Sequence, residues 1–524
     1  MYDYVIVGAG SAGCVLAARL SEDPDVRVAL FEAGGSDSRP EIAMPIAFPM
    51  LFKSSVDWDL LGDPEPGLNG RRLFLPRGKV VGGCGSINAM IYTRGNRADF
   101  DGWASDGADG WSYDDVLPYF KRSEDNERGA DEFHGVGGPL TVSDGRSLNP
   151  TVDAMIEAGI AAGHPHNLDF NGATQEGVGR FQLTQRDGLR CSTAAAFLHP
   201  ALGRPNLDLI TDAFALRIVF EGSRAVGIEV ARDDSVDVIR AEREVILSAG
   251  AYQSPVLLML SGIGPAEDLP LFGIEVREDL PVGHNLQDHA MATINYETDG
   301  PSLFDAFTPE SFALFEQGQG PLTSNIPEGG SFFRTRSGLE GPDLEIHLAA
   351  SMYYDEGLTA PHAHGYVFGS TVVKPTGRGR VMLRTPLADS KPRVLSNFLT
   401  TEEDCASMIA GVRLALGIAE QEPLQKLRPR PYSVPAGDSD AEILAFVRSV
   451  GFTVYHPTST CAIGSVVDPE LRVYGTEGLR VADASVMPTI TRANTNATAI
   501  MIGEKAADLI SGRSLSTTYE EENV

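Results

Sequence analysis

The spacing of three glycines near the N-terminus predicts a dinucleotide-binding turn. An apolar run leads into Gly8, Gly10 and Gly13, and a second apolar run, 28–31, ends at Glu32. The first glycine permits the tight turn, the second lets the backbone approach a pyrophosphate, and the third lets helix and strand pack closely. Glu32 follows Gly10 by 22 residues, where a carboxylate can accept hydrogen bonds from ribose hydroxyls. This stretch alone leaves NAD, NADP and FAD open.

Two further segments are rich in small residues. Residues 75–89 contain four glycines before an apolar stretch, and residues 248–255 follow a predicted strand at 244–247. Such loops let a backbone approach a flat or phosphorylated ligand, or else form tight surface turns. We expect the first role, because the two segments accompany the glycine turn.

Composition and charge exclude several classes of protein. A chain of 524 residues exceeds a single core, so we expect two or more domains. The net charge of −30 argues against a nucleic-acid partner and indicates a solubility or habitat trait. The chain contains no run of about 18 apolar residues, so no membrane span is predicted. The start at Tyr2, with no basic segment before the first apolar strand, favours the cytoplasm over secretion.

The five cysteines are widely spaced and form no CxxC pair, which argues against a disulfide framework or a metal site. We expect reduced, buried thiols. The one thiol kept open for a functional role is Cys84, because it lies inside a glycine turn. The five are Cys14, Cys84, Cys191, Cys405 and Cys461.

The chain resembles the glucose-methanol-choline (GMC) flavin oxidoreductases, most closely the bacterial choline-dehydrogenase-like and alcohol-dehydrogenase branch. The resemblance extends to about Ser511 and rests on six motifs in the family's order. These are Gly8-x-Gly10-x-x-Gly13, the loop 76–88, Gly250-Ala251-x-x-Ser254-Pro255 through Gly262-Ile263-Gly264-Pro265, Val282-Gly283-x-Asn285-Leu286-x-Asp288-His289, His456-Pro457-x-x-Thr460-Cys461, and Gly478 to Pro488 continued by Asn494-Thr495-Asn496-Ala497.

The chain departs from the family pattern in two loops. The family usually has serines where Cys84 and Gly85 stand, and a glycine where Ser459 stands. Some relatives also link FAD covalently through a histidine. The matching position here is Ile87, so the resemblance implies non-covalent FAD.

His456 matches the active-site histidine of the family. A neutral imidazole is the side chain best suited to take a hydroxyl proton near pH 7. Structural roles are expected for the other nine histidines, which are His134, His164, His166, His199, His284, His289, His347, His362 and His364.

The resemblance also places a histidine or asparagine beside that base, and we assign this role to Asn496. Asn494 is then expected to cap the helix that starts here. The alternative is that both asparagines are only caps. The positive end of this helix would stabilise negative charge on a reduced flavin.

The turn and the resemblance together imply a set of FAD contacts. Asn88 is expected under the ring system and Ala215 beside the adenine, although a sheet edge that only packs would also explain Ala215. The full set is Gly8, Gly10, Ser11, Ala12, Gly13, Glu32, Ala33, Arg77, Gly78, Val81, Gly82, Gly83, Ser86, Asn88, Ala89, Ala215, Ala249, Gly250, Tyr455, Asp483, Ala484, Asn496 and Ala497.

The expected fold class is α/β, or α+β overall. A Rossmann-like FAD-binding domain would be built from 1–150, 190–295 and 450–515. A discontinuous substrate-binding domain, with an antiparallel sheet and helices, would use 151–189 and 296–449. Strands are expected near 343–348, 365–373 and 380–383, a helix at 402–419, and a mobile tail at 516–524.

The expected function is FAD-dependent oxidation of a primary aliphatic or benzylic alcohol to the aldehyde. Oxygen, a quinone or another acceptor would reoxidise the flavin, and the oligomeric state is not predicted. We rank choline below these alcohols as a substrate, because an aromatic cage for its trimethylammonium group would favour tryptophan, and all three tryptophans fall in the first FAD-binding segment, 1–150. Hydroxynitrile lyase, fatty-acid photodecarboxylase and a non-catalytic FAD-binding protein are the remaining alternatives. Val373 occupies the position of the photodecarboxylase cysteine.

Overall fold

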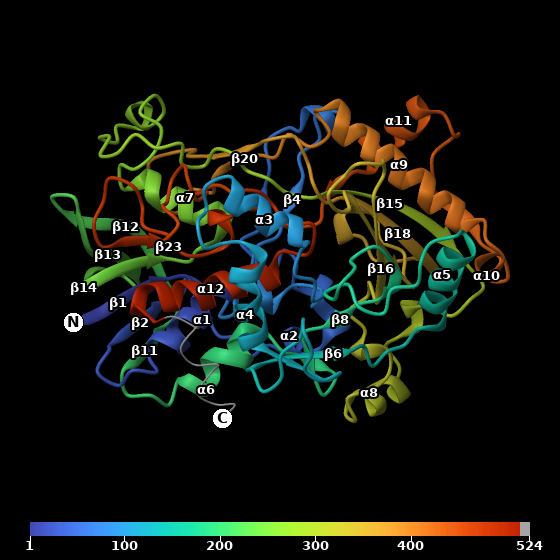
Figure 1. Cartoon of the computed structure of the whole chain (residues 1–524), viewed down its shortest axis with the longest axis horizontal. Coiled ribbons are helices and arrows are strands. Elements are labelled where there is room, and N and C mark those ends of the chain that lie inside the picture. Colours follow the sequence, from blue (N-terminus) through green and yellow to red (C-terminus); the bar gives the residue numbers. More distant parts are fainter. Residues whose placement is uncertain (514–524) are drawn as a thin grey trace.

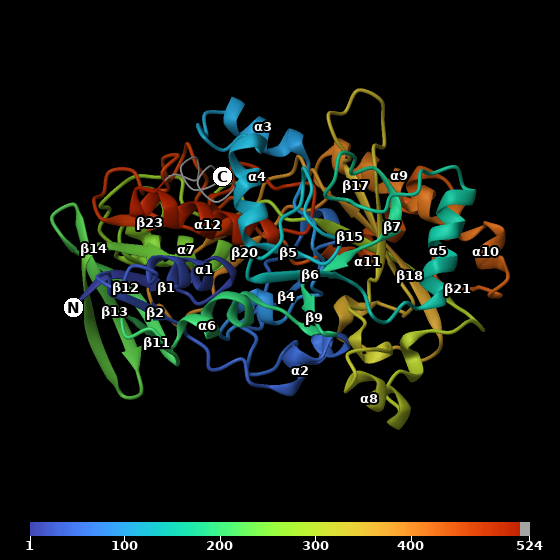
Figure 2. The ribbon, with the colours of Figure 1, turned by 60° about the horizontal axis from the view of Figure 1, so that its bottom comes forward.

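Two seven-stranded sheets organise the protein. The computed structural model describes residues 1–513, so the tail predicted at 516–524 lies outside the described residues. In Figures 1 and 2 the sheets lie toward opposite ends of the long axis, joined by loops and short helices. None of the helices between residues 1 and 513 is long and apolar enough to cross a bilayer.

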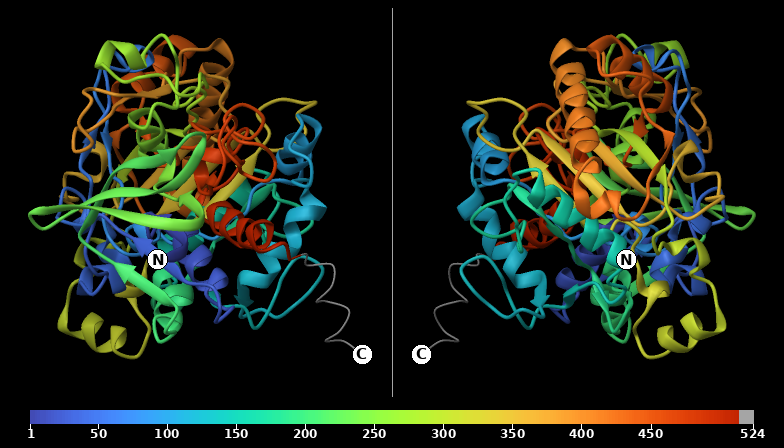
Figure 3. Two further views of the ribbon diagram at one scale, coloured as in Figure 1. Left: turned by 90° about the vertical axis from the view of Figure 1, so that its left-hand side faces the viewer. Right: turned by 90° about the vertical axis from the view of Figure 1, so that its right-hand side faces the viewer.

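The first sheet confirms the Rossmann-like prediction. Its strand order is β11-β2-β1-β14-β13-β12, and β23 pairs with the C-terminal end of β14. The pairs β11–β2, β2–β1, β1–β14 and β14–β23 are parallel, whereas β12, β13 and β14 form an antiparallel extension that projects from the body (Figure 3). The strands are β1 (Tyr2–Val7), β2 (Val28–Phe31), β11 (Leu207–Ile210), β12 (Ala213–Glu221), β13 (Arg224–Arg232), β14 (Ser235–Leu247) and β23 (Leu479–Val481).

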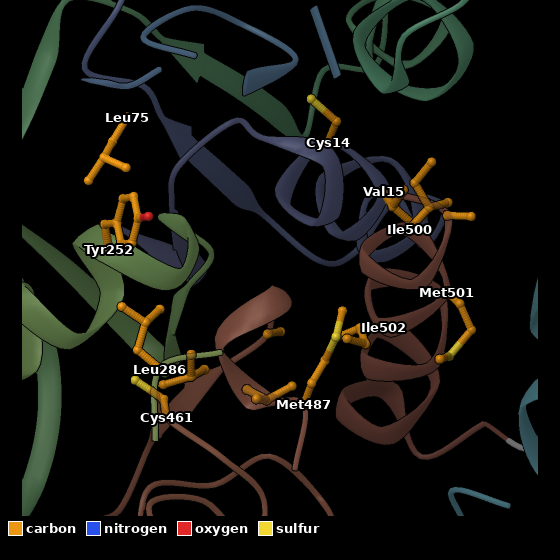
Figure 4. Packing of buried hydrophobic residues seen from close by; sticks show 14 of the residues in the cluster. Cys14, Val15, Leu75, Tyr252, Leu286, Cys461, Met487, Ile500, Met501 and Ile502 are labelled. Atoms are coloured by element: carbon orange, nitrogen blue, oxygen red, sulfur yellow. The ribbon is translucent and has the colours of Figure 1, made fainter. Parts of the chain in front are cut away.

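Two helices that lie far apart in the sequence pack together beside this sheet. They are α1 (Ser11–Leu20) and α12 (Asn496–Ser511), and α7 (Gly250–Leu260) follows β14. Gly503 permits the close approach, because a Cβ there would lie 2.9 Å from the carbonyl oxygen of Ala12. Figure 4 shows Val15 and Ile500 in this contact. The fold thus brings the last described helix to the first glycine turn.

The second sheet is antiparallel, as predicted for the other unit. Its order is β21-β15-β18-β17-β16-β7, and β22 pairs with β15. The predicted helix at 402–419 is α9 (Glu402–Ala419), and the strands predicted near 343, 365 and 380 are β17, β18 and β19 (Arg380–Met382). The strands are β7 (Gly177–Arg180), β15 (Ala290–Glu297), β16 (Gly329–Phe333), β17 (Leu344–Ala349), β18 (Gly365–Val372), β21 (Arg430–Ser433) and β22 (Phe452–Thr453).

Helices α5 (Pro150–Ala161), α9 and α10 (Glu422–Gln425) lie beside this second sheet (Figure 1). Strands β15 and β22 extend the sheet into the segments 190–295 and 450–515, because β15 pairs with β18 and β22 pairs with β15. We propose that the two units follow the two sheets, with boundaries near these strands.

A buried carboxylate holds α12 to its neighbours. Glu504 is fully buried and accepts hydrogen bonds from Arg19 at 2.8 and 2.9 Å. Arg122, on α4 (Tyr113–Ser123), lies 2.6 Å from the same carboxylate. Both arginines are about one-fifth exposed. Glu504 therefore ties three segments of the first unit together.

Replacing Glu504 with Gln should destabilise the protein by about 3 kcal/mol, because two arginines lose a buried counter-charge. Urea denaturation followed by tryptophan fluorescence would measure the change. Glu22→Gln is the matched control, since Glu22 is the exposed partner of Arg19 and such pairs contribute less than about 1 kcal/mol. Equal midpoints for the two variants would show that Glu504 is not a tie between the helices.

Candidate active site

A cavity lined by residues of both sheets contains most of the predicted site. Its empty volume is about 2190 Å³, open mouth included. Its wall runs from the glycine turn to His456, so one continuous hollow connects the two ends of the predicted site. The predicted residues on its wall are Gly8, Gly10, Ser11, Ala12, Glu32, Ala33, Arg77, Gly78, Gly83, Asn88, Ala89, Ala215, Ala249, Gly250, Tyr455, His456, Asp483, Ala484 and Asn496.

The glycine turn has the form that a pyrophosphate requires. Gly8 has φ 101°, and a Cβ on it would lie 2.5 Å from the carbonyl oxygen of Ser248. Gly10 faces the cavity, since its nearest neighbour would be 3.8 Å from an added Cβ. No side chain caps the N-terminus of α1, so its first N–H groups remain available to an anion. These features fit a bound dinucleotide.

Glu32 lines the same end of the cavity. Its carboxylate accepts hydrogen bonds from the N–H groups of Ala9, at 3.0 Å, and Gly34, at 2.9 Å. Burial raises the pKa of Glu32 to about 7, although these bonds oppose the shift. Trp58 and Phe214 lie nearby on the wall, with ring centroids 5.9 Å apart. This end can hold a ribose and a flat base.

The loop at 76–89 packs directly on the glycine turn. A Cβ on Gly83 would lie 2.6 Å from the Cα of Gly10, and one on Gly78 would lie 2.2 Å from the carbonyl oxygen of Gly83. Arg77 crosses to the other end of the site, where its guanidinium donates to the carbonyl oxygen of Tyr455 at 2.6 Å. Cys84 also lines the cavity, and its Sγ accepts from the N–H of Gly78 at 3.4 Å.

Asp483 closes the floor between the two ends. Its carboxylate accepts from the N–H of Gly250 at 2.9 Å, from Ser254 Oγ at 2.6 Å and from the N–H of Ser485 at 2.8 Å. Burial raises its pKa against these hydrogen bonds. Asp483 thereby joins α7 to the segment that follows β23.

His456 is held in a tight turn at the opposite end. Its backbone N–H donates to Asp288 Oδ1 at 2.8 Å, and the preceding Tyr455 has φ 72°. Ser459 also has φ 72°, which explains why a glycine suits this position in the resembling family. Asp288 accepts from the N–H of His289 and from Thr453 Oγ1 as well. The imidazole is therefore carried on a rigid support.

The side chain of His456 lies between an amide and a second imidazole. Its Nε2 is 3.3 Å from Asn494 Nδ2, and its Nδ1 is 3.0 Å from His289 Nδ1. The hydroxyl of Thr93 donates to Asn494 Oδ1, which turns the amide nitrogen toward His456. This network assigns a lone pair to Nε2 and the proton to Nδ1 of His456.

Burial, followed by the nearby His289 and His347, holds the pKa of His456 well below its usual value. The imidazole is therefore neutral at pH 7. A neutral imidazole whose Nε2 carries no proton is a proton acceptor. Burial likewise lowers the pKa of His289 to about 3.

The two asparagines differ from the prediction. Asn494, not Asn496, contacts His456, and Asn494 does not cap the helix. Asn496 is the first residue of α12, and its Oδ1 accepts from Ser11 Oγ at 2.6 Å. Thr495, which precedes the helix, makes no side-chain cap either. The two asparagines separate because the chain enters the helix between them, so their side chains project in different directions.

Two histidines expected to be ordinary are part of the site. His289 contacts His456, and His347 lines the cavity. His289 belongs to the motif that begins at Val282, which could have signalled its importance. No signal in the sequence indicates His347, because its place depends on the register of β17 in the second sheet.

The second sheet also lines the cavity. Thr293 of β15, Gly369 of β18 and His347 of β17 are cross-strand neighbours and share one face. Among residues 1–513, Glu32 and Asp483 are the only carboxylates on the cavity wall. Both lie among the residues predicted to contact the dinucleotide, which we call the dinucleotide cradle. Other lining residues missed by the sequence are Phe48, Phe52, Met291, Ala349, Tyr353 and Val367.

Five predicted contacts do not line the cavity. Gly13 serves the packing of α1, because a Cβ there would lie 1.9 Å from the carbonyl oxygen of Gly8. Ser86 instead donates to the carbonyl oxygen of Val81 at 2.7 Å. Gly82 forms the turn ahead of Ser86 with φ 88°, and Ala497 is buried in the first turn of α12. These residues shape the wall from behind.

Comparison with known proteins confirms the resemblance. The family models described as GMC oxidoreductase match residues 2–291 and 375–503. The chain is 42% identical to alcohol dehydrogenase [acceptor] of Pseudomonas putida, over 97% of this chain and 96% of that protein. It is 43% identical to oxygen-dependent choline dehydrogenase of Brucella ovis, over 98% and 96%.

A solved structure agrees with the fold. The crystal structure of pyridoxine 4-oxidase from Mesorbium loti superposes with a TM-score of 0.91 at 32% identity, covering 98% of this chain and 100% of that one. The family models together match more than half of the chain, and they include both the glycine turn and the His456 region. This protein therefore belongs to the GMC oxidoreductase family.

Proposed function

We propose that the protein oxidises a primary alcohol, aliphatic or benzylic, to the aldehyde with non-covalent FAD as cofactor. One observation carries this proposal: the neutral imidazole of His456 opens on the same cavity as the dinucleotide cradle. The alcohol dehydrogenase and the choline dehydrogenase that resemble the chain both carry names of enzymes acting on alcohols.

Residues of both ends would hold FAD. Gly8, Gly10 and the N-terminus of α1 would bind the pyrophosphate, and Glu32 the adenosine ribose. When bound, FAD supplies the hydride acceptor. Ile87 stands where some relatives carry the linking histidine, and its hydrocarbon side chain forms no such bond. The uncapped N-terminus of α12 points positive partial charge at the flavin end.

His456 would take the hydroxyl proton of the substrate at Nε2. In this structure the amide nitrogen of Asn494 faces Nε2 of His456. With substrate bound, it would donate a hydrogen bond to the substrate oxygen, which gains negative charge as its proton leaves. The Nδ1–H of His456 would then share the acquired positive charge with His289, since those nitrogens lie 3.0 Å apart. Asp288 would keep the imidazole in place through its hydrogen bond from the backbone N–H of His456.

The side of the cavity formed by the second sheet, where we place the substrate, favours an uncharged alcohol. Its wall is mainly apolar and aromatic, and its polar groups Thr293 and His347 are uncharged at pH 7, since burial lowers the pKa of His347 to about 4. The two lining carboxylates lie among the residues that would hold the dinucleotide. A trimethylammonium group would find aromatic rings there, such as Phe52 and Tyr353, but no counter-charge. We therefore rank choline below neutral primary alcohols. Oxygen or a quinone would accept the electrons from the flavin.

Replacing His456 with Ala should leave yellow, FAD-loaded protein whose anaerobic reduction by alcohol is slowed about 100- to 10,000-fold. Stopped-flow absorbance with benzyl alcohol, 1-octanol and choline would measure the rate and rank the substrates. The control is His166→Ala, because His166 is exposed. Alcohol should reduce the flavin of this variant at the wild-type rate. A near-normal rate in His456→Ala would remove this residue from the mechanism. Wild-type protein that never bleaches would instead favour a lyase or a non-catalytic role.

Replacing Asn494 with Ala should slow flavin reduction about 10- to 100-fold, the effect of losing one hydrogen bond to a developing charge. Asn496→Ala is the matched comparison, because it removes the same amide two residues away and loses only the contact to Ser11. Its reduction rate should fall less. A larger loss in Asn496→Ala would return the substrate-oxygen role to Asn496.

The rate of flavin reduction should be independent of pH from 8 down to 6.5. The base must be neutral to accept a proton, and its pKa lies well below 6.5, so activity is lost only as the pH falls through that lowered value. Stopped-flow reduction across pH 5–9 would test this. An inflection at pH 7 or above would contradict it.

A further inference from the structure

Arg190 is a buried guanidinium whose positive charge has no carboxylate partner among residues 1–513. It ends β10 (Leu189–Arg190) and is 7% exposed. Its Nε donates to the carbonyl oxygen of Ile42 at 2.7 Å, and its Nη1 donates to the carbonyl oxygens of Gly85 and Asn88 and to Asn88 Oδ1. Nη2 has no hydrogen-bond partner in the described chain, and within residues 1–513 no carboxylate lies within 4 Å of the guanidinium.

The other arginines buried to this degree are all paired. Arg94, Arg480 and Arg492 lie within 2.6 Å of Glu124, Glu244 and Asp99. The chain has 72 acidic residues against 42 basic ones, so acids are abundant. Burial lowers the pKa of Arg190 to about 9, which reflects the cost of a charge without a counter-ion. An anion placed nearby would offset that cost.

Three of the four hydrogen bonds of Arg190 go to residues 85–88, at the end of the loop that packs on the glycine turn. Two of them go to Asn88, which lines the cavity with Ala89, Met90 and Ile91. One bond goes to the backbone carbonyl oxygen of Asn88 and the other to its Oδ1, which also accepts from the N–H of Met90. The amide nitrogen of Asn88 therefore stays available to donate. A few residues further on, Thr93 donates to Asn494, the neighbour of His456.

We propose that Arg190 is a positioning residue for the flavin: it fixes Asn88 and places an uncompensated positive charge behind the loop, which favours the reduced, anionic flavin. The proposal rests on the function proposed above. Oxidation of an alcohol would transfer the α-hydrogen together with its C–H electron pair to the flavin, and the hydroxyl proton to His456. The flavin is left with one negative charge, and Arg190 would be its counter-charge.

Sulfite tests this charge without turnover. The sulfur lone pair of sulfite forms a bond to flavin N5, and a negative charge is left on the pyrimidine ring, as after reduction. We compare Arg190→Met, which removes the charge at similar length, with Arg190→Lys, which keeps it. The control is Arg186→Met, because Arg186 is exposed and donates to Thr141 Oγ1 and the carbonyl oxygen of Pro139.

Arg190→Met should raise the sulfite dissociation constant at least tenfold, while Arg190→Lys stays within threefold of wild type and Arg186→Met is unchanged. The midpoint potential, measured against a reference dye, should fall in Arg190→Met by about 30 mV for each tenfold change, as for a two-electron couple. The FAD content of each variant is measured by absorbance before its titration, so that only flavin-loaded protein is compared.

A flavin-loaded Arg190→Met protein with wild-type sulfite affinity and potential would overturn the proposal. If Arg190→Met fails to bind FAD, Arg190→Lys decides: affinity within threefold of wild type supports the charge, and a tenfold loss overturns it. Wild-type protein without flavin would overturn the proposed function instead, so the two failures are distinguishable.

Discussion

The close approach of backbone segments at the carboxyl end of β1 is the constraint on which the rest of the structure depends. Gly8 lies against the strand end at Ser248, Gly13 against Gly8, and Gly83 against Gly10, each at a distance that excludes a side chain. These contacts bring the β14 end and the 76–89 loop to one point. The N-terminus of α1 then faces the cavity with unbonded N–H groups, which is the property an anionic cofactor needs.

Desolvation sets the electrostatics of the cavity built on that point. The same burial raises the pKa of Glu32 and of Asp288 and lowers the pKa of His456. The carboxylates are accordingly held by backbone N–H groups, whereas His456 is left neutral between an amide and a second imidazole. Arg190 is the complementary case, a buried positive charge bonded only to neutral oxygens. A charge that develops during the reaction would therefore meet prearranged partners instead of water.

The success of prediction differed between local and non-local features. The glycine turn, the strand before it and the helix at 402–419 depend on nearby residues, and each is confirmed. The assignment of Asn496 to the base failed, because both asparagines fit the start of a helix and only the direction of each side chain separates them. His289, for which the sequence predicts only a structural role, contacts His456 across 167 residues of sequence.

The sequence by itself determined the family and the two-sheet architecture and indicated His456 as the candidate base, because these are carried by motifs of local spacing and by the periodicity of apolar residues. Only the tertiary structure decided which groups contact His456 and which residues of the second sheet line the cavity. Asn494 and His347 reach the cavity from segments nearly 150 residues apart in the chain. Their contacts depend on strand register and on the packing of α12 against α1, and both arise from long-range burial that no local pattern specifies.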